Sequence, residues 1–369
     1  FSNFTFFLND PINGDQIQQK ESRMIYGYRG NYNTTGSLFG RPLRTEFGAG
    51  LRIDDISDVS LSHTIKREFL SDFKRGDIFE SNVNAYVNEV FDLTEKISLI
   101  ASVRFDYFQF RYKDQLFETN DSESRSIASP KLNITYQIDR TTQLYVRSGF
   151  GFHSNDARSV TKQDGIEILP RAFGIDLGVN SKLTDKFLLN AALWRLDLEQ
   201  EFVYVGDEGV VEPSGRSLRE GIDLSLRYEI SPWLFADADV NFTRPRSKDE
   251  PEGNNYIPLA PTFSTIGGLT LTFKNGFAGS FRYRYLADRA ANEDKSVIAD
   301  GYILADATLN YTRPNFEIGL SAENIFNIEW NEAQFDTESR LKDEAEPVSE
   351  IHFTPGTPLF VKLKLCFSF

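Results

Sequence analysis

Apolar and polar side chains alternate with a period of two along much of the chain, and helical periodicity is rare. The alternation is clearest in segments 97–107, 277–285 and 359–369. In the first segment one face carries Ile97, Leu99, Ala101, Val103, Phe105 and Tyr107, and the other face carries Ser98, Ser102, Arg104 and Asp106. In the second segment Phe277, Phe281, Tyr283 and Tyr285 share one face, and Arg282 and Arg284 share the other. In the third segment the polar face carries Lys362, Lys364 and Cys366. This period predicts β-strands, and the charged face predicts that one side of the sheet is wet.

Short connections alternate with longer polar ones. The short ones lie at 54–57, 93–96, 139–142, 183–186, 231–232, 274–276 and 313–315. The longer ones lie at 30–42, 113–124, 154–169, 206–214, 247–257, 287–298 and 331–355, with a short exception at 73–77. Outer-membrane barrels show this alternation, with short periplasmic turns and longer outer loops. We therefore predict an all-β chain, a transmembrane antiparallel up-and-down β-barrel with about 17 strands, many of which project beyond the outer side of the membrane.

Composition supports a membrane barrel and excludes several other classes. Aromatic residues make up 14% and charged residues 25% of the 369 residues, which fits a sheet with one apolar and one wet face. No run of about 18 apolar residues predicts a transmembrane helix. One cysteine and three histidines leave little material for a multi-thiolate metal site, and no cofactor motif is present. The net charge of −14 argues against a nucleic-acid partner.

Three stretches resemble the TonB-dependent outer-membrane receptor family. Residues 322–330, Ala-Glu-Asn-Ile-Phe-Asn-Ile-Glu-Trp, resemble the family's penultimate-strand pattern of Asn-Leu-Phe-Asp followed by an aromatic residue, and depart from it at Ile325, Asn327 and Trp330. Residues 355–358, Pro-Gly-Thr-Pro, resemble the family's entry to the final strand, which here ends in Phe369. A terminal aromatic resembles the signal that barrel-insertion machinery reads. Residues 145–158 are similar to a strand-to-loop stretch in some of these receptors.

The resemblance implies a 22-stranded barrel that holds a plug in its lumen, in the outer membrane of a Gram-negative bacterium. Such receptors import a scarce nutrient, for example a siderophore, haem or cobalamin, with energy that the TonB complex delivers through the plug. Residues 1–8 read as the middle of a strand. We therefore expect residues 1–369 to be the C-terminal portion of the barrel, without the N-terminal plug and first strands. Expected partners are outer-membrane lipid, the TonB complex through the absent plug, a small nutrient and a surface lipoprotein.

Candidate ligand contacts lie where strands end in outer loops. His153, Asn155, Asp156 and Arg158 could contact a polar ligand or a metal chelate, or could organise the loop by hydrogen bonds. Tyr204, Tyr256 and Trp330 could stack on a ligand, or could belong to the aromatic girdle at the membrane interface.

Three arginines share the wet face of their strands. Arg104, Arg282 and Arg284 should line the lumen, where they could meet anionic ligands, pair with acids such as Asp106, or contact the plug. The acidic loop from Asn331 to Ile351 could attract cations, or could simply be solvated. No catalytic constellation and no metal site is recognisable in the sequence, so we expect a transporter and not an enzyme.

Three alternatives stay open at this point. A passive porin-like channel would lack a plug and would conduct ions steadily. A surface-exposed outer-membrane enzyme or adhesin would use the outer loops, and an enzyme would need an acid–base set above the membrane. A secreted β-sandwich would fold without detergent, which the arginines on the wet faces and the terminal Phe369 disfavour.

The terminal aromatic generates a first prediction. Deletion of Phe369 should lower the yield of barrel assembled in the membrane while synthesis continues, because the insertion signal is lost. Immunoblots of membrane and total fractions measure both quantities. An unchanged membrane yield would show that Phe369 is not such a signal.

Overall fold

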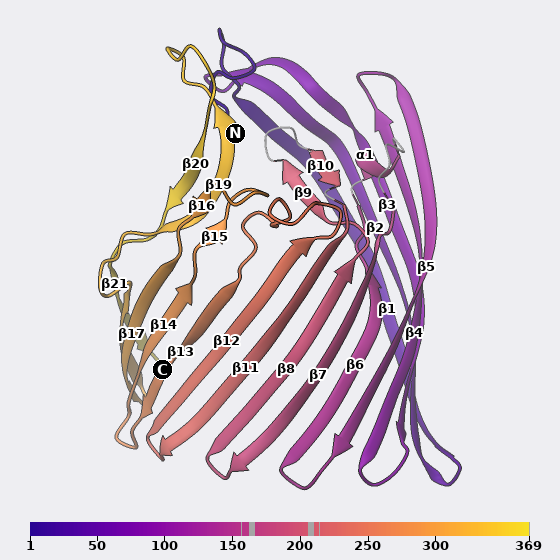
Figure 1. Ribbon diagram of the computed structural model, residues 1–369, viewed down its shortest axis with the longest axis vertical. Coiled ribbons are helices and arrows are strands. Elements are labelled where there is room, and N and C mark those ends of the chain that lie inside the picture. The colour runs from indigo at the N-terminus through magenta and orange to yellow at the C-terminus, as the bar shows by residue number, and fades with distance from the viewer. Residues whose placement is uncertain (156, 162–166, 206–209, 214, 369) are drawn as a thin grey trace.

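The protein is one large antiparallel sheet that curls into a tilted wall (Figure 1). The computed structural model describes residues 1–155, 157–161, 167–205, 210–213 and 215–368, and only the backbone at 202–205 and 210–213. In this part of the chain the sheet contains 15 strands, close to the number expected, and each pairs with the strand of the same sheet that follows it along the chain. The all-β, up-and-down architecture predicted from the sequence is confirmed.

The 15 strands of the wall are β1 (Ile17–Leu38), β2 (Arg41–Ile65), β3 (Glu68–Asp92), β4 (Ile97–Asp114), β5 (Thr119–Gln137), β6 (Thr142–Phe152), β7 (Arg171–Thr184), β8 (Phe187–Leu198), β11 (Ser217–Ser231), β12 (Leu234–Ser247), β13 (Phe263–Thr272), β14 (Phe277–Leu286), β17 (Tyr302–Arg313), β18 (Phe316–Glu323) and β21 (Phe360–Phe367). Three hairpins rise from its upper rim: β9 (Phe202–Val205) with β10 (Val210–Pro213), β15 (Arg289–Ala290) with β16 (Ile298–Ala299), and β19 (Asn331–Ser339) with β20 (Val348–Pro355). One helical turn, α1 (Ala157–Val160), lies between β6 and β7.

Several expected boundaries near the N-terminus are wrong. The expected loop at 30–42 is a tight turn, in which Phe39 and Gly40 have φ angles of 51° and 74° between β1 and β2. The expected turn at 54–57 is a bulge inside β2, where pairing with β3 shifts between Ile56 and Val59. The expected break at 73–77 lies inside β3. A bulge and a turn use the same polar residues, so local sequence does not separate them.

The first residues are not a strand, contrary to expectation. Among them, Ser2 and Phe6 make only isolated bridges, to Ile17 and Arg340. Strand periodicity in Phe1–Leu8 reflects an aromatic cluster that packs on an outer hairpin, described below. Short runs of alternating residues do not distinguish these two cases.

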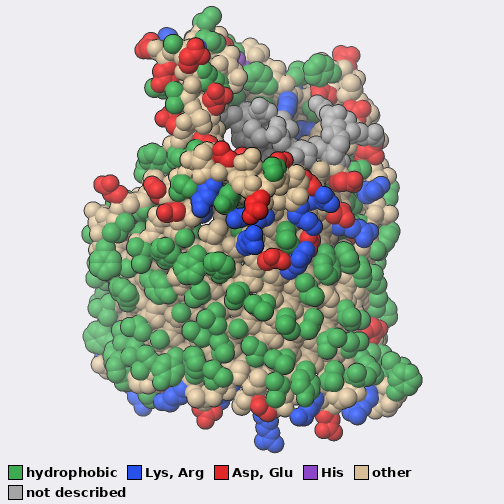
Figure 2. Space-filling view, in the orientation of Figure 1, with side chains coloured by type: hydrophobic (Ala, Val, Ile, Leu, Met, Phe, Trp, Pro, Cys, Tyr) green, Lys and Arg blue, Asp and Glu red, His purple; other side chains and the backbone are tan. Residues whose placement is uncertain are grey.

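The outer surface of the wall is an apolar band. In Figure 2 the band covers the lower part of the molecule, with charged side chains below it and above it. Its members come from neighbouring strands in register, for example Leu193 on β8, which lies opposite Ile222 on β11 and Leu177 on β7. All three side chains are about half exposed, as expected for residues that face lipid. The face opposite carries the polar members of the same strands.

The polarity of the two faces inverts above the band. On β4, Val103, Phe105 and Tyr107 point outward and are exposed, whereas Arg104 and Asp106 point inward. Beyond Tyr107 the inward residues become apolar, with Phe108, Phe110 and Tyr112, and the outward ones become polar, with Gln109, Arg111 and Lys113. The inversion marks the outer boundary of the membrane, because above it the outer face meets water instead of lipid.

The wall has two unpaired edges within the described residues, β1 and β21. Nearly every side chain of β1 is exposed on both faces, and so is all of β21. No helix among the described residues is long and apolar enough to cross a membrane.

Two adjacent alanines on β8 test the assignment of the faces. Ala191 shares the outward face with Leu193, and Ala192 points into the lumen. Ala191→Lys should destabilise the folded barrel by about 2–4 kcal/mol, because a cation near the middle of the lipid face is costly. Ala192→Lys is the matched control and should have little effect. Folding into lipid vesicles, followed by the gel mobility of unheated samples, measures both. Equal losses would contradict the assignment.

Candidate functional site

Arginine–carboxylate pairs line the inner face of the wall. Each of the three arginines on this face has an acidic partner: Arg104 with Asp106, Arg282 with Asp237, and Arg284 with Asp306. In the first pair Nε and Oδ2 are 2.8 Å apart, and Asp106 is fully buried. The buried carboxylate holds the guanidinium in place while the remaining N–H groups face the lumen. This is the pairing that the sequence left open as one of their roles.

Two cavities open on this polar wall. The first, of about 500 Å³, is lined by Glu46, Tyr86, Asn88, Ser102, Arg104, Ser129, Lys131 and residues 150–152. Within it the Tyr86 hydroxyl donates to Glu46 at 2.5 Å, and the buried Ser129 Oγ has no hydrogen-bond partner among the described residues. The second, of about 620 Å³, is lined by acids, amides and aromatics that include Tyr145, Asp176, Asn190, Trp194, Asp223 and Asn241.

Sequence reasoning missed most of these cavity residues. One signal was available, since Gly48 lies opposite Tyr86 in the β2–β3 register. A Cβ at Gly48 would come within 2.1 Å of the Tyr86 ring, so the glycine lets this ring lie flat on β2. The sequence does not give the pairing of Gly48 with Tyr86, because it predicts a turn where β2 has a bulge, and a turn there would end the strand.

The connection between β6 and β7 folds inward instead of standing above the rim. The His153 backbone N–H donates to the Pro170 carbonyl at 3.2 Å, which brings the two ends of this loop together. The buried Asn155 donates from Nδ2 to the Glu167 carbonyl at 2.6 Å. Asn155 therefore organises the loop by a hydrogen bond, which is one of the two roles considered for it from the sequence. His153 is exposed, Arg158 is half-buried, and Asp156 lies outside the described residues.

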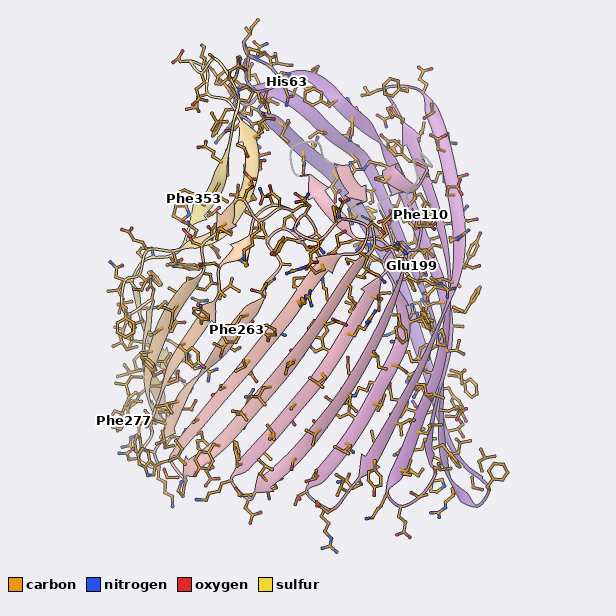
Figure 3. All side chains as sticks on the ribbon, in the orientation of Figure 1. His63, Phe110, Glu199, Phe263, Phe277 and Phe353 are labelled. Atoms are coloured by element: carbon orange, nitrogen blue, oxygen red, sulfur yellow. The ribbon has the colours of Figure 1, made fainter. Side chains whose placement is uncertain are left out.

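The loop is seated on the apolar inner face above the membrane. Ala157, Val160 and Leu169 are buried against a set of wall residues: Ile56, Ile78, Phe110, Tyr112 and Ile127. Figure 3 shows Phe110 in the upper part of the wall. The Ala157 N–H also donates to Glu80 Oε1 at 3.3 Å. The apolar inner face of β2–β5 above the membrane is thus covered by this loop.

Tyr256 is partly covered by cations. The Arg246 guanidinium lies 4.2 Å from the centre of its ring, and Lys295 Nζ lies 5.5 Å from it. This arrangement occupies the face that a ligand would stack on. Tyr204 lies on β9, where only the backbone is described, so its predicted contact is outside what the structure describes.

The motif at 322–330 holds the end of β18 and the start of β21 together. The buried Asn324 donates to the carbonyls of Ile328 and Thr357, at 2.8 and 3.2 Å. Asn327 Oδ1 accepts from the Leu359 N–H at 2.9 Å. Trp330 Nε1 donates to the same Thr357 carbonyl, so Trp330 supports this turn as well. These residues are structural.

An outer clasp, formed by residues 1–16 and the β19–β20 hairpin, was not predicted. The Phe7 N–H donates to the Arg340 carbonyl at 2.9 Å, and Arg340 Nε donates back to the Phe7 carbonyl at 3.1 Å. Phe4 packs edge-on against Phe335. At its other end, the segment places the Gly14 carbonyl 2.6 Å from His63 Nε2, near the top of β2 (Figure 3). The clasp ties the two ends of the open wall at the outer rim.

Charge in the clasp is tuned by hydrogen bonds. The backbone N–H of Asn13 and its side-chain amide, followed by the N–H of Ile12, hold the pKa of Asp10 below its usual range. Asp10 therefore stays ionised, 4.0 Å from His63 Nε2. Among the described residues no group of three or more His, Cys, Asp and Glu side chains is placed to hold a metal ion.

Known proteins share this fold. The family model described as TonB dependent receptor-like, beta-barrel matches residues 1–325. The ferric-catecholate import receptor Fiu from Escherichia coli K12, in its closed form, has a TM-score of 0.72 at 15% identity, over 94% of this chain and 55% of that chain. The ferric citrate transporter FecA has a TM-score of 0.76 at 13% identity, over 95% and 55%. The copper transporter OprC has a TM-score of 0.73 at 16% identity, over 96% and 57%. The chain thus spans about half the length of these structures.

The seat of the inward loop can be tested directly. Val160→Asp should release the loop, because an unpaired charge in an apolar site costs about 3–5 kcal/mol. Released loops are cut by protease, so limited proteolysis in detergent should cleave the variant between residues 153 and 170 faster than the wild type. Val160→Ala keeps the site apolar and is the matched control. Equal cleavage of wild type and Val160→Asp would refute the seating.

Proposed function

The chain belongs to the TonB-dependent receptor β-barrel family, and from this premise we propose that it forms the barrel wall of a receptor that imports a scarce nutrient. The family places the protein in the bacterial outer membrane, which confirms the location predicted from the sequence. Import would draw its energy from the TonB complex. The role is transport and not catalysis.

One observation carries the proposal most strongly, namely the contrast between the two faces of the wall. The outer face is an apolar band, whereas the inner face holds paired charges and two polar cavities. A lumen of this kind suits the passage of a polar solute through an apolar membrane. The described part of the β6–β7 loop packs on the inner face of the wall, where it would meet a solute that enters the lumen.

The nutrient is proposed to be a small chelate or cofactor, such as a siderophore, haem or cobalamin. Similar structures carry the names of ferric-catecholate, ferric citrate and copper transporters, which supports this class at the level of fold. We propose His153 and Arg158 among its first contacts, with Asp156, which lies outside the described residues, as a further candidate. Tyr204 remains a candidate contact, while Tyr256 and Asn155 are assigned here to structure.

The wall is proposed to be completed by further strands and a plug. An unpaired strand edge cannot face lipid, because each unsatisfied backbone group there costs several kcal/mol. Both β1 and β21 are such edges among the described residues, so other strands would pair with them. Inside the lumen the side chain of Ile266 is 49% exposed beside the arginines of β14, which suits a domain that covers the inner face. The plug would also be the partner of the TonB complex.

Uptake measurements test the function. Cells that carry the complete gene should accumulate one radiolabelled nutrient from a panel of ferric siderophores, haem and cobalamin. Uptake should fall to background in a strain without TonB, since the barrel alone supplies no energy. The same accumulation with and without TonB, together with steady conductance in planar bilayers, would instead identify a passive channel. A surface lipoprotein partner would appear as a co-purified protein that raises uptake.

A further inference from the structure

A patch of basic side chains lies on the outward face of the wall, directly above the apolar band. Figure 2 shows Lys and Arg side chains gathered there, over the upper ends of the strands that face the viewer. The patch comprises five basic residues, Arg195, Arg216, Arg244, Arg246 and Lys248, and three acidic residues, Asp197, Glu220 and Asp249. Its net charge of +2 contrasts with the net charge of −14 of the whole chain.

Strand register fixes the height of the patch. Arg195 follows Leu193 on the outward face of β8, and Arg244 follows Phe242 on the outward face of β12. Leu193 and Phe242 lie opposite the same residue, Ile222. The change from an apolar to a basic residue therefore occurs at the same level on β8 and β12. Two residues advance a strand by about 6.6 Å, and less along the membrane normal because the strands tilt. The guanidinium groups therefore begin where the apolar band ends, at the level of lipid headgroups.

The acidic residues of the patch form ion pairs with only some of its basic residues. Arg195 bonds both Asp197 and Glu220, at 2.8 and 3.2 Å, and Lys248 shares Asp197 at 3.0 Å. The remaining acid pairs with Arg216.

Two arginines of the patch have guanidinium N–H groups with no acidic partner among the described residues. Arg244 is exposed and has no ion-pair partner among the described residues. Arg246 lies on the Tyr256 ring, and among the described residues its side chain donates a hydrogen bond only to the Pro245 carbonyl. The arrangement therefore presents two guanidinium groups without an acidic partner among the described residues, those of Arg244 and Arg246, on the outward face of the barrel.

The direction of the patch excludes the transported nutrient as its partner. Its side chains point away from the lumen, on the same face as Leu193 and Ile222. Next to the barrel at this height lie the headgroups of the outer leaflet. Arginine forms bidentate hydrogen bonds with phosphate oxygens, and clusters of basic residues at a membrane surface attract anionic headgroups.

We propose that this patch binds the phosphate groups of a lipid in the outer leaflet, with Arg244 and Arg246 as the principal contacts. The apolar band below would receive the acyl chains of the same lipid. This inference goes beyond nutrient import and does not depend on it.

Binding of a phosphorylated lipid tests the proposal. The complete protein in a zwitterionic detergent is titrated with lipid A, and with lipid A from which the phosphates have been removed, and the bound lipid is followed by native mass spectrometry. The variant with Arg244→Ala and Arg246→Ala should bind lipid A about 25-fold more weakly, at roughly a fivefold loss per cation. The variant with Arg244→Lys and Arg246→Lys should recover most of the binding.

A matched control removes two cations from the opposite rim. Arg140 and Lys274 lie in lower turns, and Arg140→Ala with Lys274→Ala should leave lipid binding unchanged. The proposal fails if this control loses as much binding as the patch variant, or if the patch variant binds like the wild type. It also fails if dephosphorylated lipid binds the wild type equally well, a measurement that needs no variant. If inorganic phosphate alone displaced lipid A from the wild type as well as unlabelled lipid A does, the site would be one for free anions, and the lipid assignment would be overturned.

Discussion

The backbone must be fully paired where it meets lipid, and the rest of this structure depends on that constraint. Water cannot satisfy an N–H or C=O group in the bilayer, so each strand has to pair with a neighbour along its membrane-crossing length. The described wall meets this constraint from β1 to β21, because each strand of the sheet pairs with the next strand of the sheet along the chain. The same constraint makes the two open edges of the described wall incompatible with lipid, which is the basis for proposing further strands beside β1 and β21.

Side chains follow a second rule that changes along each strand. Within the membrane the outward face is apolar and the inward face is polar, as Phe105 and Arg104 show on β4. Above the membrane both faces would meet water, so the sheet needs an inner core to stay ordered. The inward β6–β7 loop supplies it by burying Val160 and Leu169 against Phe110 and its neighbours. A single sheet thus has a membrane half and a water-soluble half, and the loop at the entrance belongs to the second.

The two faces of the wall differ in how far their charged side chains are paired, and this difference suits each face to a different partner. Inside, the buried carboxylate of Asp106 fixes Arg104, so the lumen is polar with its charges largely compensated. In the basic patch on the outer face above the band, five cations stand beside three acids, and Arg244 has no acidic partner among the residues described. A compensated wall suits a solute or plug that must move, because strong fixed charge would hold it. An uncompensated patch suits a lipid that stays beside the barrel.

The alternation of side chains alone determined the fold class, the lipid and lumen faces, and the lumen position of Arg104, Arg282 and Arg284, because a period of two encodes a face locally. The motif around Asn324 and the run at Pro355 also pointed to the family from the sequence alone. Tertiary structure decided the rest. A bulge at Asp58 and a turn share the same polar residues, the inward loop meets strands distant in sequence, and the clasp joins Phe7 to Arg340. These contacts depend on which distant segments the curled sheet brings together, which local periodicity does not encode.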